Sequence, residues 1–393
     1  MAILLGLLII AAISYLGSVY AFSKEKLPAI LRYLFFSGFE YILLGIALGP
    51  IGLDLFPKTM TASFAPIIHL GLGWVGLFLG LQLRISDINR LQSNHLAITF
   101  LQVLFTGMLV ALALWFPLKS LLSSQPYLLH VSVAALAASA SISSPTIMYL
   151  IGKETGYREK ILKLLHVITN LDGIIAVAVI GIAFTLLRPV AGYYGSLLLL
   201  FQSVGIGVFL GYIFTQLPRE KLTENELIVI FLGFLLFSSG VGGILQVSPL
   251  FINLVCGMYL ANMLTKDDKF HAVIINAEKP LYILMLIIAG IMFSYPGGFG
   301  LLLSFLIIVF RFAGKYLFMA YAAPRLDRSM TFPANAGFAL ASQGAMALTI
   351  GFAFLTTYPG NNSEILFSVI LICVMVSEMI APYLITKVFR GIS

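Results

Sequence analysis

Three acidic residues, Glu40, Asp172 and Glu378, lie inside long apolar stretches, whereas the other acidic residues lie in loops or near the ends of such stretches. A carboxylate at membrane depth costs at least about 2.5 kcal/mol on insertion scales, so it marks a functional position by default. Asp172 is the strongest candidate because it lies near the middle of its stretch, in the polar run 166–173. Its carboxylate can hold either a proton or a cation but not both, and that competition is sufficient for antiport.

The residues next to Asp172 strengthen this interpretation. Thr169 precedes Asp172 by three positions, so the two side chains share one face of a helix. Gly173 leaves room for an ion or for a neighbouring backbone, and Asn170 completes the candidate ion-binding set on this helix. The alternative is that Asp172 is a structural residue held by hydrogen bonds between helices.

A second polar set lies in the apolar stretch 128–150, which reads Ser-Ala-Ser-Ile-Ser-Ser-Pro-Thr over 139–146. Pro145 has no N–H, so the carbonyl of Ser141 loses its helical partner and becomes a potential cation ligand. A similar interruption is expected at Ser342-Gln343-Gly344 in the second half. Two interrupted helices in corresponding halves indicate a binding site near the bilayer midplane, although Ser and Pro can also merely kink or pack helices. The hydroxyl residues predicted to bind the ion or proton are Ser141, Ser143, Ser144 and Thr146.

Further polar residues are expected to support this core. Arg311 and Lys315 are four residues apart, and a buried Arg311 needs a carboxylate or freed carbonyls as its partner. One alternative is a structural salt bridge from Arg311 to Glu378 or Glu40, and another is a role in transport. Lys315 can also simply extend to the membrane interface. The predicted supporting residues are Glu378, Arg311, Lys315, Ser342 and Gln343; Glu40 fits a packing or gating pair better, and Asp172 alone is a candidate ligand for Na+ or K+.

The composition requires that membrane helices position these residues. Of 393 residues, 60% are hydrophobic and only 10% are charged, against about 25% charged residues in an ordinary soluble domain. This composition excludes a soluble enzyme, a disordered chain and a nucleic-acid-binding protein. We predict an all-α membrane protein with about thirteen transmembrane helices, since about 20 apolar residues cross the hydrocarbon core. They lie near 2–20, 28–49, 64–83, 95–117, 128–150, 162–186, 193–216, 224–241, 246–265, 277–294, 298–320, 331–355 and 364–387.

The basic residues predict the orientation of the chain. Only Lys58, Lys119 and Arg188 lie in the loops after even-numbered segments, whereas most of the 23 Lys and Arg residues lie after odd-numbered ones or in the C-terminal tail. Because basic loops stay in the cytoplasm, the N-terminus is expected outside and the C-terminus inside.

The predicted thirteen segments divide into two six-helix repeats of opposite orientation within a single transporter domain, 1–393. The first repeat covers 1–186, the segment 193–216 connects the halves, and the second repeat covers 224–387. Small residues recur at corresponding places, such as Gly45 and Gly257 in segments 2 and 9, and Gly80 and Gly290 in segments 3 and 10. Such inverted repeats are typical of secondary transporters.

In these motifs the chain resembles the monovalent cation:proton antiporter family, which includes sodium/proton exchangers and potassium-efflux proteins. The resemblance covers essentially the whole chain in segment order, through 76–83, 143–146, 171–176, 311–315 and 342–348. It implies a homodimer in which a core bundle with two crossed, broken helices moves against a dimerisation panel in an elevator-like alternation of access. It also implies that Asp172 is the exchanging carboxylate, with Thr169 and the hydroxyls of 139–146 assisting it. Unlike related potassium-efflux systems, the chain is expected to lack a cytoplasmic nucleotide-binding extension.

The chain departs from the family pattern at several positions. Leu171 stands where the family often has Asn or a second Asp, and Ser144 replaces a common Asp. No acid closely follows Gly344, and no Lys stands in the middle of segment 10. One exchanging carboxylate without a compensating Lys predicts electroneutral, one-for-one exchange.

The sequence therefore favours a secondary transporter, not an enzyme, that exchanges Na+ or K+ for H+ in the cell (inner) membrane. Its expected partners are monovalent cations, protons, the lipid bilayer and a second copy of the chain, with no nucleic acid and no resident cofactor. One alternative is a sodium-coupled symporter of organic anions on a similar fold. Another is a membrane sensor subunit that transports nothing, since several family acids are missing.

Overall fold

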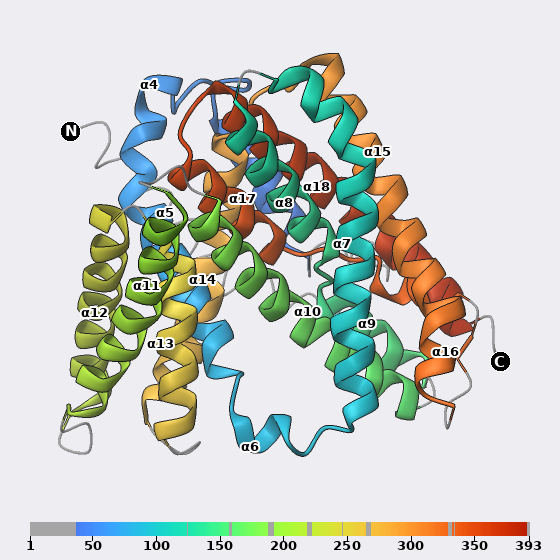
Figure 1. Ribbon diagram of the computed structural model, residues 1–393, viewed down its shortest axis with the longest axis horizontal. Helices are drawn as coiled ribbons and strands as arrows, with labels where there is room; N and C mark the ends of the chain where they lie inside the picture. Colours follow the sequence, from blue (N-terminus) through green and yellow to red (C-terminus); the bar gives the residue numbers. More distant parts are fainter. Residues whose placement is uncertain are drawn as a thin grey trace.

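A computed structural model of the protein describes residues 37–123, 125–156, 159–187, 192–217, 222–245, 247–264, 269–328, 332–333 and 335–390. The predicted first segment, 2–20, and the first nine residues of the second, 28–36, lie outside these residues. Within the described ranges all regular secondary structure is helical, as Figure 1 shows. Among the residues that the structure describes, seven helices are long and apolar enough to cross a membrane, in agreement with the predicted class.

The elements agree with the predicted segments to within a few residues at most ends. In chain order they are α3 (Phe39–Leu48), α4 (Lys58–Thr61), η2 (Ala62–Phe64), α5 (Ala65–Leu81), α6 (Ile85–Ile88), α7 (Ser93–Leu121), α8 (Pro126–Ser141), α9 (Pro145–Glu154), α10 (Glu159–Leu186), α11 (Gly192–Thr215), α12 (Glu224–Leu245), α13 (Pro249–Met263), α14 (Lys269–Ile291), α15 (Gly297–Leu317), η4 (Phe318–Ala322), α16 (Ala323–Leu326), η5 (Ala336–Leu340), α17 (Met346–Thr357) and α18 (Asn361–Arg390).

The helices form two groups that lie on opposite sides of Figure 1. The first group contains α5, α11, α12, α13 and α14, and the second contains α7, α8, α9, α15 and α18. We call these the panel and the bundle; α3 belongs to the panel, and α10, η5 and α17 belong to the bundle through their contacts.

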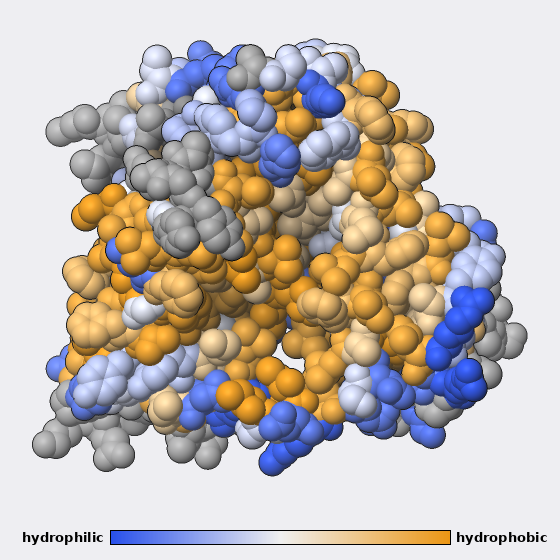
Figure 2. All heavy atoms as spheres, viewed as in Figure 1, coloured by the Kyte–Doolittle hydropathy of each residue, from blue (hydrophilic) through white to orange (hydrophobic). Residues whose placement is uncertain are grey.

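In Figure 2 apolar residues cover the middle of the molecule and hydrophilic residues gather at its upper and lower ends. This distribution is the one expected for a protein embedded in a bilayer.

Glycines let the panel helices approach backbone to backbone. An added Cβ on Gly80 of α5 would lie 2.7 Å from the Cα of Gly257 on α13. An added Cβ on Gly45 of α3 would lie 2.8 Å from the Cα of Gly290 on α14. No side chain fits at such distances, so these four positions require glycine, as small-residue interfaces between membrane helices generally do.

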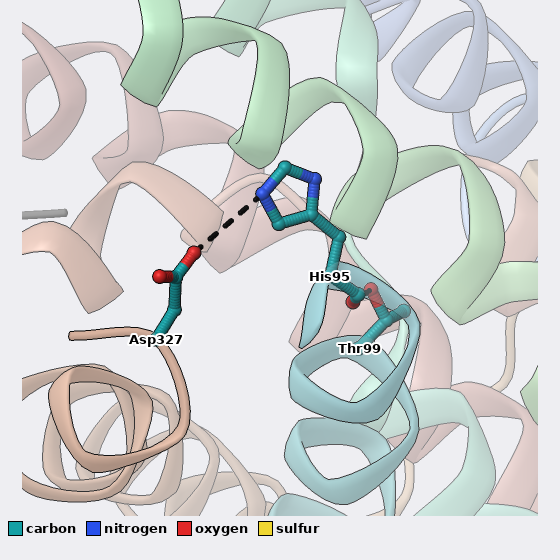
Figure 3. Close-up of polar contacts among 3 residues, drawn as sticks. All are labelled: His95, Thr99 and Asp327. Carbon is teal, nitrogen blue, oxygen red and sulfur yellow. Dashed lines mark hydrogen bonds and ion pairs between the residues drawn. The ribbon is translucent and has the colours of Figure 1, made fainter. Parts of the chain in front are cut away.

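A polar contact joins two distant segments of the bundle just after α16. His95, in the first turn of α7, places its Nε2 3.8 Å from the Oδ2 of Asp327, which follows α16 (Figure 3). Asp327 is almost completely buried there. The contact holds the beginning of α7 against the segment that leads into the second broken helix.

Candidate functional site

The segment predicted near 128–150 is interrupted where the sequence placed the break. Helix α8 ends at Ser141 and α9 begins at Pro145, with extended backbone between them. The Nζ of Lys315, on α15, donates hydrogen bonds to the carbonyls of Ser141 (3.1 Å) and Ile142 (3.2 Å) and to the hydroxyl of Ser143. One expectation is corrected here: the freed carbonyl of Ser141 binds the Lys315 ammonium instead of standing open to a metal ion. Of the two alternatives for Lys315, the structure shows a fully buried core residue and not one that extends to the interface.

The second predicted interruption is also present, between η5, which ends at Leu340, and α17, which begins at Met346. Its first half is a short 3-10 helix instead of the expected longer helix from 331. The Arg311 guanidinium donates to the carbonyls of Leu340 (3.3 Å), Ala341 (2.7 Å), Ser342 (3.1 Å) and Ile142 (3.0 Å). The carbonyls at the C-terminal end of the first half of each broken helix thus bind a cationic side chain, Lys315 at the first break and Arg311 at the second. A positive charge at this place compensates the negative end of a helix dipole.

Glu378, on α18, binds the opposite side of the second break. Its carboxylate accepts hydrogen bonds from the Ser342 hydroxyl (2.8 and 3.0 Å) and from the backbone N–H groups of Gln343 (2.8 Å) and Gly344 (2.6 Å). The suggested salt bridge from Arg311 to Glu378 does not form among the described residues. Arg311 instead donates its hydrogen bonds to backbone carbonyls, and Glu378 accepts hydrogen bonds from backbone N–H groups. Both kinds of backbone group are available because a broken helix leaves carbonyls and N–H groups without partners.

The two breaks contact each other directly. The backbone N–H of Ser144 donates to the carbonyl of Ser342 at 2.9 Å, and the Gln343 amide donates to the carbonyl of Ser139 at 2.8 Å. Gly344 has φ +69°, and an added Cβ would lie 2.8 Å from the Cβ of Ser144. A glycine is therefore required at 344 both by the backbone conformation and by the close approach of the first break.

Asp172 lies on α10 beside this crossing and is completely buried. Its carboxylate interacts electrostatically with Lys315 and Arg311, and the hydroxyl and backbone N–H of Ser143 face it. No hydrogen bond of ordinary geometry reaches either carboxylate oxygen from the described residues. A buried carboxylate without such partners is costly unless a proton or a cation neutralises it.

A cavity of about 380 Å³ lies against the crossing and reaches most of the predicted ligands. Its wall includes Ser143, Ser144, Thr146, Thr169 and Asn170, together with Gln343. Figure 2 shows the surface hollowed between the two helix groups. Asp172 is not part of the cavity wall; it lies behind Ser143, which is the residue that both faces the carboxylate and lines the cavity.

One predicted ligand, Ser141, has different surroundings from those expected. The Ser141 hydroxyl donates to the carbonyl of Ala138 in its own helix at 2.8 Å and does not line the cavity. Glu40 lies in the first turn of α3, on the panel, and is also outside the cavity wall. The Asn170 side-chain amide hydrogen-bonds to His166 Nε2 at 3.2 Å and also lines the cavity.

Sequence reasoning missed the opposite wall of the cavity. The residues there are mostly large and apolar, and they come from the panel helices and α17: Trp74, Phe78, Gln82, Tyr282, Met285, Leu286 and Phe352. Nothing in the sequence distinguishes Trp74 from an ordinary packing residue. The only signal in the sequence was Gln82, a polar residue at the end of an apolar helix.

Comparisons with known proteins agree with this architecture. The family model described as "Sodium/hydrogen exchanger, transmembrane" matches residues 5–391. The chain belongs to the sodium/hydrogen exchanger family. This sodium/hydrogen exchanger is therefore a membrane ion transporter and not an enzyme, and the resemblance of the sequence motifs is confirmed.

Solved structures show the same fold. The exchanger matches the sodium proton antiporter MjNhaP1 from Methanocaldococcus jannaschii at pH 8 with a TM-score of 0.66 and 16% identity, covering 99% of this chain and 100% of that one. It matches a second structure, an electron-microscopy map of MjNhaP1, with a TM-score of 0.56 and 16% identity, covering 100% and 96%. No curated protein matches the exchanger.

Proposed function

We propose that this exchanger carries Na+ or K+ in exchange for H+ by alternating access, and that Asp172 is the group on which the two compete. The observation that supports this is a fully buried carboxylate without a conventional hydrogen-bond partner, next to hydroxyls that line a cavity. A proton or a monovalent cation would neutralise it equally well. Loss of one would then accompany arrival of the other.

The cavity supplies oxygen ligands of the kind that hard cations prefer. We propose Ser143, Ser144, Thr146, Thr169 and the amide of Asn170 as groups that replace part of the hydration shell while the ion approaches Asp172. Ser143 has a central role because it faces both the cavity and the carboxylate. Ser141 would contribute its carbonyl only after Lys315 had moved away.

The number of protons exchanged depends on Lys315. The sequence favoured electroneutral exchange because no lysine stands in the middle of segment 10, but the ammonium of Lys315, on α15, lies among the oxygens of the first break. The site therefore holds a second titratable group. We propose that Lys315 gives up its proton when the cation binds, so that more than one proton crosses per cation.

The movement is proposed to be that of the bundle against the panel. The Gly45–Gly290 contact joins segments 2 and 10, and the Gly257–Gly80 contact joins segments 9 and 3. An inverted repeat that relates segment 2 to 9 and 3 to 10 converts one contact into the other. This supports the division into repeats 1–186 and 224–387 around the connector 193–216, with a rigid panel against which the broken helices move.

Two further features of the proposal follow from the sequence and family. The excess of basic residues after odd-numbered segments supports an external N-terminus and a cytoplasmic C-terminus in a cell membrane. A homodimer through the panel is the arrangement that the family resemblance implies. Cross-linking across the panel in native membranes would test the dimer.

Ion exchange can be tested in proteoliposomes that contain a pH-sensitive dye. Addition of Na+ or K+ should move protons in the wild type, and Asp172→Asn should abolish the signal. Asp54→Asn is a matched control, because Asp54 is an exposed loop residue whose positive φ (51°) Asn tolerates. Equal activity of Asp172→Asn and wild type would contradict the site, and sodium-dependent uptake of an organic anion without proton movement would favour the symporter.

A further inference from the structure

Glu378 has a place in the fold that corresponds to that of Asp172. Asp172 lies on α10, the helix that follows the first broken helix, and Glu378 lies on α18, the helix that follows the second. The Asp172 carboxylate is faced by the N–H of Ser143 just before α9, and the Glu378 carboxylate by the N–H groups of Gln343 and Gly344 just before α17. The two carboxylates therefore occupy equivalent positions in the two halves.

The surroundings of the two carboxylates differ in one respect. Three donors hold Glu378 at 2.6–3.0 Å, and two of them are backbone N–H groups in the segment just before the twelve-residue helix α17. Asp172 has no such bond within the described residues. Hydrogen bonds from ordered donors and a helix N-terminus both stabilise a negative charge. These hydrogen bonds therefore hold the Glu378 carboxylate in place.

The four charged residues at the crossing balance one another. Asp172 and Glu378 are acidic, Arg311 and Lys315 are basic, and all four are buried. Arg311 interacts electrostatically with both carboxylates. Without Glu378 the cluster would carry one additional positive charge, and a positive charge in a region of low dielectric repels an arriving cation.

We propose that Glu378 is a positioning residue that sets the cation affinity of the site: a fixed counter-charge, equivalent to Asp172 in the other half, that does not itself exchange. It acts through Arg311 and through Gln343 and Gly344, which precede α17 and line the cavity. This inference rests on the proposed cation/proton exchange.

The test compares Glu378→Gln with Glu378→Asp in proteoliposomes at one fixed pH, with KM for Na+ or K+ and kcat measured separately. Loss of the charge in Glu378→Gln should raise KM on the order of tenfold and leave kcat within about threefold. Glu378→Asp keeps the charge and should restore a KM close to that of the wild type. A merely structural residue would instead lower the amount of folded protein and leave the KM of the folded fraction unchanged.

Ser342→Ala is the matched control, because it removes one donor to Glu378 and keeps the charge. Its KM should stay within about twofold of the wild type. The proposal is overturned if Glu378→Gln keeps the wild-type KM or if Glu378→Asp is as defective as Glu378→Gln. Should Glu378→Gln fail to fold, Glu378→Asp decides alone: it keeps the counter-charge, so a tenfold higher KM in folded Glu378→Asp would overturn the proposal. Wild-type protein that exchanges no cation would instead contradict the proposed function.

Discussion

The ammonium of Lys315 and the hydroxyl of Ser143 form a direct hydrogen bond inside the first broken helix. The same Ser143 faces the carboxylate of Asp172 and lines the cavity. A cation that binds to this hydroxyl therefore competes with Lys315 for one ligand and approaches Asp172 at the same time. The arrangement links ion binding to displacement of a resident positive charge.

Replacement of Lys315 should change how exchange responds to the membrane potential. If Lys315 releases a proton when the cation binds, wild-type exchange is electrogenic, whereas Lys315→Met exchange, with Asp172 alone titrating, is electroneutral. The measurement is the rate of cation-driven proton movement in proteoliposomes with and without an imposed potassium or lithium diffusion potential. A wild-type exchange rate that does not depend on the membrane potential would contradict the role of Lys315. It would favour the electroneutral exchange of one cation for one proton.

The hydroxyls of the first break should differ in importance. Ser143→Ala removes a group that faces both the cavity and Asp172, so it should raise the KM for the cation by roughly tenfold, the cost of one lost ligand to a charged group. Ser141→Ala should remain close to the wild type, because the Ser141 hydroxyl is bound within its own helix. The two variants provide matched controls for each other in the dye assay. Equal effects of both changes would contradict the assignment.

Gly344 should be far more sensitive to substitution than another glycine of the same backbone conformation. Gly344 and Gly297 both have φ +69°, but an added Cβ meets Ser144 only at position 344 and open space at 297. Gly297→Ala should cost about 1 kcal/mol of unfolding free energy from backbone strain, and Gly344→Ala should cost roughly 1–3 kcal/mol more from overpacking. Thermal unfolding of the purified proteins checks this, and an equal loss in both would argue against the close crossing.

The rigidity of the panel depends on its glycine contacts. Gly80→Ala should lower the melting temperature, because the new methyl group would lie against the backbone of Gly257. Overpacking of this kind typically costs about 1–3 kcal/mol of unfolding free energy. Gly233→Ala, at a panel position with open space around it, is the control and should be neutral or slightly stabilising. A neutral Gly80→Ala would mean that α5 and α13 can separate without loss.

Much of the fold could be predicted because each determinant is local in the sequence. Apolar length fixes the helices, Pro145 fixes the first break, and an acid in an apolar run singles out Asp172. The second break was found from Ser342-Gln343-Gly344, where the positive φ of Gly344 is the physical reason.

The partners within the core could not be predicted, because they depend on how helices distant in sequence are packed. Lys315 could have extended to the interface, and Arg311 could have paired with an acid, with equal local plausibility. The structure decides both cases by the carbonyl groups that the two breaks expose. The aromatic wall of the cavity was missed for the same reason: Trp74 and Phe352 are ordinary apolar residues until the panel and the bundle meet.

The most direct test of the central claim is proton release on cation binding by the purified protein in a weakly buffered detergent solution. Addition of NaCl or KCl, with choline chloride as the ionic-strength control, should release protons from the wild type. The same addition should release none from Asp172→Asn. Cation binding without proton release by the wild type, or undiminished release from Asp172→Asn, would contradict competition at this carboxylate.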